Sequence, residues 1–133
     1  MRDGDTTPTV YAVDDDPIIL AHLKAALAAG GYRVTEFLEP RAALRAAVAE
    51  PPSLLILDVR MPVIDGVELL GRLRASEAFG DTPVIMLTGG MRLDRIVLAM
   101  SAGANGYLMK PFTAEQILAK VDEHLWDAAR GRA

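Results

Sequence analysis

Short apolar runs alternate with longer helix-like segments five times along the chain. The runs at 10–13 and 54–57 are continuously apolar, which is typical of parallel strands that are covered on both faces. Strands that alternate with helices predict right-handed crossovers, and hence a single doubly wound α/β domain with helices on both faces of the sheet. Strands are expected near 9–14, 32–37, 53–58, 83–88 and 105–109, and helices near 17–29, 40–49, 65–76, 91–102 and 114–127.

Capping residues at the ends of the expected helices support these boundaries. Asp16 and Pro17 combine an N-cap aspartate with a proline at the first helical position. Thr113 and Gln116 have the spacing of a capping box at the start of the last helix. Gly103 is placed to end the fourth helix in the left-handed conformation that glycine adopts readily. The caps therefore agree with the hydrophobic pattern.

Size and charge limit the possible classes of protein. A chain of 133 residues can bury one core, and we expect a flexible N-terminus at 1–8, one domain at 9–127 and a tail or linker start at 128–133. The net charge of −4 and the scattered arginines argue against direct binding of nucleic acid. The absence of cysteine excludes disulfides and thiolate sites, and no apolar run is long enough for a membrane span. A cytoplasmic protein without a membrane anchor is expected.

Carboxylates follow two of the apolar strands at the point where each strand ends. Asp14 and Asp15 follow the run Val10–Val13, and Asp58 follows the apolar residues near 53–57. If these strands are neighbours, their carboxyl ends bring the three acids to one edge of the sheet, where α/β proteins bind ligands. Three carboxylates in one place repel each other unless a cation lies among them, and an oxygen-only set of ligands favours Mg²⁺ over zinc. The sequence therefore predicts a magnesium-dependent acidic pocket.

Two further strand ends supply groups that suit an anion. Thr88 ends the fourth strand with a hydroxyl group, and Gly89 and Gly90 allow backbone amides to approach a ligand closely. Lys110 ends the fifth strand with an ammonium group. Together with a metal ion, these donors suit a phosphoryl group, whose charge is spread over several oxygens. The alternative for Lys110 taken alone is a surface lysine that pairs with an acid.

Four motifs occur in an order and at spacings that resemble the receiver domain of two-component response regulators. The resemblance covers about residues 9–127 and implies the flavodoxin-like (βα)5 fold with the strand order 2-1-3-4-5 of the chemotaxis receiver. Each motif is weak alone, but the ordered set is specific. The motifs are Val13–Pro17, Leu57–Gly66, Leu87–Gly89 and Tyr107–Phe112.

The resemblance implies a phosphorylation chemistry for the acidic pocket. Asp58 would accept a phosphoryl group from a phosphohistidine on a sensor histidine kinase or a phosphotransfer protein. Mg²⁺ would be held by Asp14 and Asp15, by Asp58, and by the backbone carbonyl of Arg60. Some relatives have asparagine at the position of Arg60, but a backbone contact does not depend on the side chain. The long cation of Arg60 leaves the lifetime of the phosphorylated form open.

The resemblance also assigns roles to the two remaining strand ends. Thr88, Gly89 and Lys110 would bind the phosphoryl group. Thr88 and Tyr107 would act as a conformational switch, for which the alternative is that Tyr107 merely packs at a strand end. Lys110 and Pro111 would be joined by a cis peptide bond, which proline tolerates better than other residues.

A change at this switch would alter the face made by the fourth helix, the fifth strand and the fifth helix. That face would control an effector domain or partner protein, or would form a homodimer. The competing hypothesis is a Mg²⁺-dependent phosphohydrolase with an aspartyl-phosphate intermediate, but Arg60 stands where such an enzyme would have a second aspartate as general acid. A flavodoxin-type electron carrier is disfavoured because an acidic pocket repels a flavin phosphate. We therefore expect a switch that catalyses only its own phosphorylation and dephosphorylation.

Overall fold

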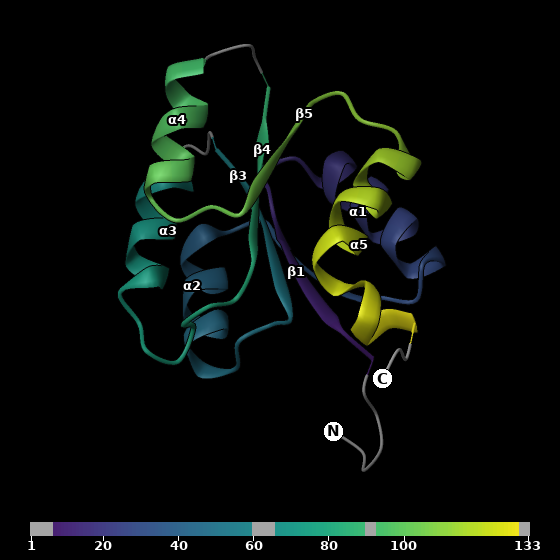
Figure 1. The fold of residues 1–133 in the computed structure, drawn as a ribbon, viewed down its shortest axis with the longest axis horizontal. Coiled ribbons are helices and arrows are strands. Elements are labelled where there is room, and N and C mark those ends of the chain that lie inside the picture. Colours follow the sequence, from purple (N-terminus) through teal and green to yellow (C-terminus); the bar gives the residue numbers. More distant parts are fainter. Residues whose placement is uncertain (1–6, 60–65, 90–92, 131–133) are drawn as a thin grey trace.

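Five parallel strands and five helices alternate along the described residues of the computed structural model (Figure 1). The structure describes residues 7–59, 66–89 and 93–130, and for 93–95 and 126–130 it describes the backbone alone. The strands are β1 (Thr9–Val13), β2 (Arg33–Phe37), β3 (Leu54–Asp58), β4 (Val84–Thr88) and β5 (Gly106–Met109). The helices are α1 (Pro17–Ala29), α2 (Pro40–Ala49), α3 (Gly66–Arg74), α4 (Leu93–Ser101) and α5 (Ala114–Arg130).

The sheet has the order β2-β1-β3-β4-β5, with every neighbouring pair parallel. Helices α1 and α5 cover one face, and α2, α3 and α4 cover the other (Figure 1). This arrangement confirms the expected doubly wound α/β fold and its strand order. Among the helices that the structure describes, none is both long enough and apolar enough to cross a membrane.

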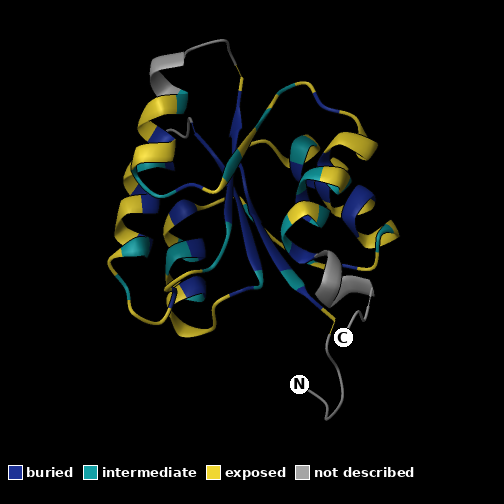
Figure 2. Cartoon of the chain, viewed as in Figure 1, coloured by how far each residue is buried: buried dark blue, intermediate teal, exposed yellow. Residues whose placement is uncertain are grey.

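Burial explains why the three inner strands are apolar except at their ends. Every residue of β3 and β4 is buried, and in β1 only Thr9 is partly exposed, because helices cover both faces of these strands (Figure 2). The edge strands are more exposed. In β2, the exposed residues Arg33, Thr35 and Glu36 make the open edge polar, which disfavours pairing with another chain.

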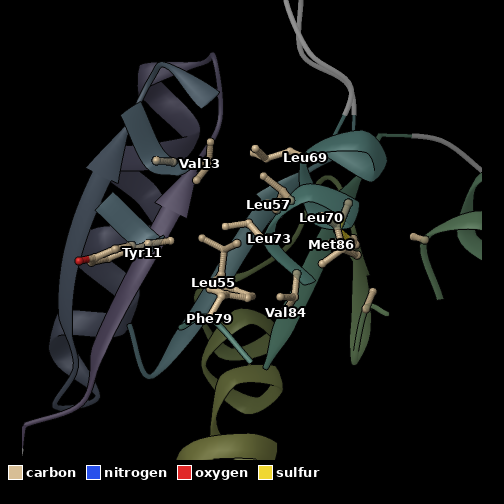
Figure 3. Close-up of a cluster of buried hydrophobic side chains, with 14 of the residues drawn as sticks. Tyr11, Val13, Leu55, Leu57, Leu69, Leu70, Leu73, Phe79, Val84 and Met86 are labelled. Atoms are coloured by element: carbon tan, nitrogen blue, oxygen red, sulfur yellow. The ribbon is translucent and has the colours of Figure 1, made fainter. Parts of the chain in front are cut away.

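Alternate residues of β3 enter two separate hydrophobic clusters. Leu55 and Leu57 point toward α2, α3 and α4, where they belong to the cluster of Figure 3, which also includes Leu70 and Met86. Ile56 belongs to the opposite cluster, with side chains of α1 and α5. The period of two is that of a strand whose faces are both covered. Truncation of one such buried leucine to alanine typically costs about 2–5 kcal/mol, so these two clusters dominate the stability of the domain.

The predicted caps are present. Asp16 accepts a hydrogen bond from the backbone N–H of Ile18 at 2.9 Å. The backbone N–H of Thr113 donates to Gln116 at 2.8 Å, and the backbone N–H of Gln116 donates to Thr113 at 3.1 Å, which completes the capping box. Gly103 follows α4 with a φ of +111°. Helix α5 runs to Arg130, three residues past its expected end at 127, since no glycine or proline precedes Gly131 in that stretch.

Two glycines with opposite surroundings allow a test of the packing. A Cβ atom at Gly71, inside α3, would meet nothing within 4 Å, so Gly71→Ala should raise the free energy of unfolding by about 0.5–1 kcal/mol through higher helix propensity. A Cβ atom at Gly30 would lie 2.3 Å from Leu118 Cδ1, so Leu118 must move aside and Gly30→Ala should lower the free energy of unfolding by up to about 1 kcal/mol. Chemical denaturation measures both, and equal effects of the two variants would contradict the close contact of Gly30 with α5.

Candidate functional site

The carboxyl ends of β1 and β3 bring three carboxylates together. Val13 is paired with Leu57 across these neighbouring strands, so the residues that follow, Asp14 and Asp58, lie at the same edge of the sheet. One carboxylate oxygen from each of Asp14, Asp15 and Asp58 lies within 4.8 Å of the others. Asp14 is fully buried and Asp58 is 4% exposed, whereas Asp15 faces solvent. The structure therefore brings together the three acids that the sequence predicted.

Backbone hydrogen bonds hold Asp14 in place. Its N–H donates to the carbonyl of Phe37 at 3.1 Å, which extends the pairing of β1 with β2 by one residue. Its Oδ1 accepts a hydrogen bond from the backbone N–H of Asp16 at 2.9 Å, which turns the chain toward α1. Asp16 itself caps α1 and lies outside the group of three acids. The buried carboxylate is thus fixed by the loop that it organises.

Lys110 supplies positive charge to this group. Its Nζ lies 2.9 Å from Asp14 Oδ2 and 3.3 Å from Asp58 Oδ1. Burial alone would lower the pKa of Lys110, but pairing with Asp14 and the negative charge of Asp58 outweigh burial and raise the pKa above its usual value. Lys110 is therefore fully charged at neutral pH. The contribution of this pairing to stability is present below the ordinary lysine pKa and is lost only as the pH rises through the raised value.

Thr88 and Lys110 are linked through the backbone. The N–H of Lys110 donates to the carbonyl of Thr88 at 2.7 Å, and the side chain of Thr88 is buried at the end of β4. Gly89 is exposed, and a Cβ atom there would meet nothing within 4 Å, so the space beside Thr88 is open. The peptide between Lys110 and Pro111 is cis. Tyr107 lies on the edge strand β5 and is 42% exposed.

Gly66 is a positioning residue that the sequence analysis did not single out. A Cβ atom at Gly66 would lie 2.1 Å from the backbone oxygen of Asp58, and the N–H of Gly66 donates to the carbonyl of Val59 at 2.9 Å. The first residue of α3 therefore packs directly on the backbone of Asp58, which only glycine permits. The Asp65-Gly66 pair at the end of the second motif was the available signal. Asp65, like Arg60 and Gly90, lies outside the described residues.

The group of acids fits a hard divalent cation. Its ligand atoms are all carboxylate oxygens, from one exposed and two buried residues, so an ion could enter from solvent on the side of Asp15. Oxygen ligands suit Mg²⁺, which keeps several of its waters and takes few protein ligands. The three acids carry more negative charge than Lys110 can balance, which favours the binding of a further cation.

Comparison with known proteins identifies relatives over most of the chain. A profile of the response regulator receiver domain matches residues 10–122. The transcriptional regulatory protein PrrA of Mycobacterium tuberculosis is 39% identical over 121 residues, which are 91% of this chain and 51% of that protein. The DNA-binding dual master transcriptional regulator RpaA of Synechocystis is 35% identical over 114 residues, 86% of this chain and 47% of that protein. The chain spans about half the length of these curated relatives.

Solved structures give the same result for the fold. The chemotaxis protein CheY4 of Vibrio cholerae superposes with a TM-score of 0.85 at 32% sequence identity. The match covers 90% of this chain and 99% of CheY4. The receiver domain of the sensor histidine kinase PA1611 from Pseudomonas aeruginosa superposes with a TM-score of 0.82 at 28% identity, and the match covers 90% of this chain and 98% of that domain. That domain is described with a magnesium ion coordinated in its active-site cleft. The chain belongs to the response regulator receiver domain family of two-component signalling systems.

Proposed function

We propose that the domain at 9–127 is a phosphorylation-dependent switch that accepts a phosphoryl group on Asp58 from a phosphohistidine of a sensor kinase or phosphotransfer protein. One observation carries the proposal: Asp58 lies within 4.8 Å of two further carboxylates and 3.3 Å from the Lys110 ammonium. A carboxylate between a metal site and a cation is placed to attack phosphorus, because both neutralise the negative charge that repels it from a phosphoryl group.

Asp14, Asp15 and Asp58 are the residues that would hold Mg²⁺. The backbone carbonyl of Arg60 is proposed as a further ligand from the family resemblance and lies outside the described residues. When bound, the ion neutralises the carboxylates and draws charge from the phosphoryl oxygens. Asp14 has a second function, since it fixes Lys110 at the site through their 2.9 Å ion pair.

In the proposed transfer, an oxygen of Asp58 forms a bond to phosphorus while the bond from phosphorus to the histidine nitrogen breaks. The imidazole leaves with the electron pair of that bond and takes up a proton. Lys110 pairs with the phosphoryl oxygens, and the hydroxyl of Thr88 and the backbone N–H of Gly89 donate hydrogen bonds to them. Hydrolysis reverses the modification, because attack by water on phosphorus releases phosphate and restores the Asp58 carboxylate. The domain thus catalyses only its own phosphorylation and dephosphorylation.

The output is proposed to pass through the face formed by α4, β5 and α5. The 2.7 Å backbone hydrogen bond between Lys110 and Thr88 couples the ends of β4 and β5, so a movement of Thr88 toward a phosphoryl group affects both strands. A shift in population needs only a few kcal/mol of differential binding to the phosphoryl group. Large apolar side chains are exposed on this face, which supports contact with an effector domain, a partner protein or a second copy. They are Val97, Leu98, Met100, Tyr107 and Met109.

The phosphohistidine donor is proposed to dock beside α1. This helix begins immediately after the acidic loop, and Ile18 in its first turn is 77% exposed. Ala21 and Ala25, which follow Ile18 at helical spacing, are exposed as well. Small side chains allow a partner helix to approach closely, next to Asp15. We propose that this exchange takes place in the cytoplasm. Relatives of about twice the length are transcriptional regulators, which supports an effector domain as one output.

Replacement of Asp58 by asparagine should abolish phosphorylation. The wild type is expected to gain the mass of one phosphoryl group from acetyl phosphate in the presence of Mg²⁺, since only the carboxylate supplies the attacking oxygen. Asp81→Asn is a matched control, because Asp81 is an exposed aspartate outside the acidic group. Intact-protein mass spectrometry reads the result. Equal labelling of Asp58→Asn and the wild type would rule out Asp58 as the acceptor.

Replacement of Asp15 by asparagine should separate metal binding from stability. Loss of one of the three ligand carboxylates should weaken Mg²⁺ binding about tenfold or more, while weaker repulsion should raise the melting temperature without metal. Asp16→Asn is the control, because asparagine caps a helix as well as aspartate does and Asp16 is not in the group. Calorimetric titration and thermal melting in a chelator measure the two effects. Undiminished affinity in Asp15→Asn would show that Asp15 is not a ligand.

Replacement of Thr88 by alanine should uncouple phosphorylation from the distant response. With beryllium fluoride and Mg²⁺ as a phosphoryl mimic, the wild type should show amide chemical-shift changes at the site and at Val97 and Tyr107. Thr88→Ala should keep the changes near Asp14 and lose those at Val97 and Tyr107, because the hydroxyl is the group that moves. Thr88→Ser retains the hydroxyl and should respond like the wild type. Distant shifts that persist in Thr88→Ala would exclude Thr88 as the trigger.

A further inference from the structure

Arg74, the last residue of α3, uses all of its side-chain donors at the end of the sheet opposite Asp58. Its Nε and Nη2 donate to the carbonyl of Gly103 at 3.2 and 2.8 Å. Its Nη1 donates to the carbonyls of Gly80 and Thr82 at 2.9 and 2.7 Å. Its Nη2 also donates to Asn105 Oδ1 at 2.9 Å. A guanidinium has five N–H donors, so the planar group is fully engaged. It therefore joins the α3–β4 connection to the α4–β5 connection.

Asn105 extends this junction to the first residue of β4. Its Oδ1 accepts a hydrogen bond from the N–H of Val84 at 2.8 Å, and its own N–H donates to the carbonyl of Val84 at the same distance. The guanidinium of Arg74 also lies over the buried ring of Phe79, 5.4 Å from the ring centroid. The C-terminal end of α4 is thus tied through Gly103 and Asn105 to the fixed sheet and its core.

The chain just after α4 is shaped to receive Arg74. The N–H groups of residues 102–104 return to carbonyls in the last turn of α4. Gly103 has a φ of +111°, and a Cβ atom there would lie 3.0 Å from Arg74 Nε. Glycine therefore provides both the turn and the space for the guanidinium. The C-terminal end of α4 is therefore closely packed and hydrogen-bonded against Arg74.

The side chains of α4 that the structure describes are mostly exposed. Between Ile96 and Ser101, only Ala99 is buried, while Val97, Leu98 and Met100 are exposed. Helix α4 runs back along β4, so its C-terminal end lies at the Val84 end of the sheet and its first turn lies toward the Thr88 end (Figure 1). At 1.5 Å per residue, a tilt of about 10° around the C-terminal end moves the first turn by about 2 Å.

We propose that Arg74 and Asn105 form a fixed pivot for α4, around which activation swings the end of the helix nearest Thr88. This inference rests on the proposed function, because phosphorylation at Asp58 drives the swing. The pivot converts a small movement of Thr88 into a rotation of the exposed apolar side chains of α4. Without the pivot, the whole helix would shift or loosen, and the response would spread to the start of β5.

Hydrogen–deuterium exchange of the full chain tests the pivot, with beryllium fluoride and Mg²⁺ as the phosphoryl mimic. In the wild type, exchange should change at 93–98 and at the acidic loops but not at 99–106. Arg74→Lys keeps the charge but loses the planar fork of donors, so exchange at 99–106 should become about tenfold faster and should respond to the mimic. Arg72→Lys is the matched control on the same helix, because Arg72 is exposed and pairs only with Glu68 in the described structure.

A purely structural role for Arg74 would speed exchange at 99–106 in Arg74→Lys without making that segment respond to the mimic. The response of 99–106 to the mimic therefore distinguishes a pivot from a purely structural contact. Phosphorylation by acetyl phosphate should be equal in the wild type and both variants. A wild type in which 99–106 changes as much as 93–98, or in which α4 does not respond while the site does, overturns the pivot alone. A wild type with no response even at Asp14 and Asp58 overturns the proposed function and the pivot together. If Arg74→Lys does not fold, the exchange pattern of the wild type and that of Asn105→Ala test the pivot in its place, with the same expected and contradicting results at 99–106.

Discussion

The rest of this structure depends on the burial of two carboxylates, Asp14 and Asp58, at the ends of neighbouring strands. Buried like charges are unstable without compensation, and Lys110 lies within 3.3 Å of both. That requirement brings the end of β5 to the ends of β1 and β3, and the backbone of Lys110 in turn holds Thr88. Among the described residues, Lys110 pairs with two of the three clustered carboxylates, so its single positive charge cannot balance all three. This excess of negative charge favours a cation at the edge, and that cation is what would allow the proposed phosphoryl group to approach.

The two ends of the sheet have different tasks. At the carboxyl end, charged groups are close together and depend on what binds there. At the opposite end, Arg74 and Asn105 satisfy one another and the surrounding carbonyl groups. The two clusters of apolar side chains keep the strands between these ends rigid. A domain that is fixed at one end and charge-sensitive at the other suits a switch, because binding energy released at the site can act on the elements that are held least firmly.

Local sequence patterns were sufficient to predict the strands and helices and the clustering of the three acids. Continuous apolar runs predicted the inner strands, and the positions of Asp14 and Asp58 after those runs predicted that they meet. The strand order came from the family resemblance. Three features depend on side chains or backbone that converge from distant elements, and the sequence did not reveal them: the closer approach of Lys110 to Asp14 than to Asp58, the packing of Gly66 on the backbone of Asp58, and the five bonds of Arg74. No periodicity records such contacts.

The central claim is that phosphoryl transfer occurs at one carboxylate of this edge and depends on a divalent cation. Reduction of the acyl phosphate with borohydride after treatment with acetyl phosphate, followed by peptide mapping, locates the modified residue directly. A single modified position, Asp58, is expected with Mg²⁺ present, and no modification is expected in a chelator. Modification at another carboxylate, or labelling of Asp58 that does not depend on the metal, would contradict it.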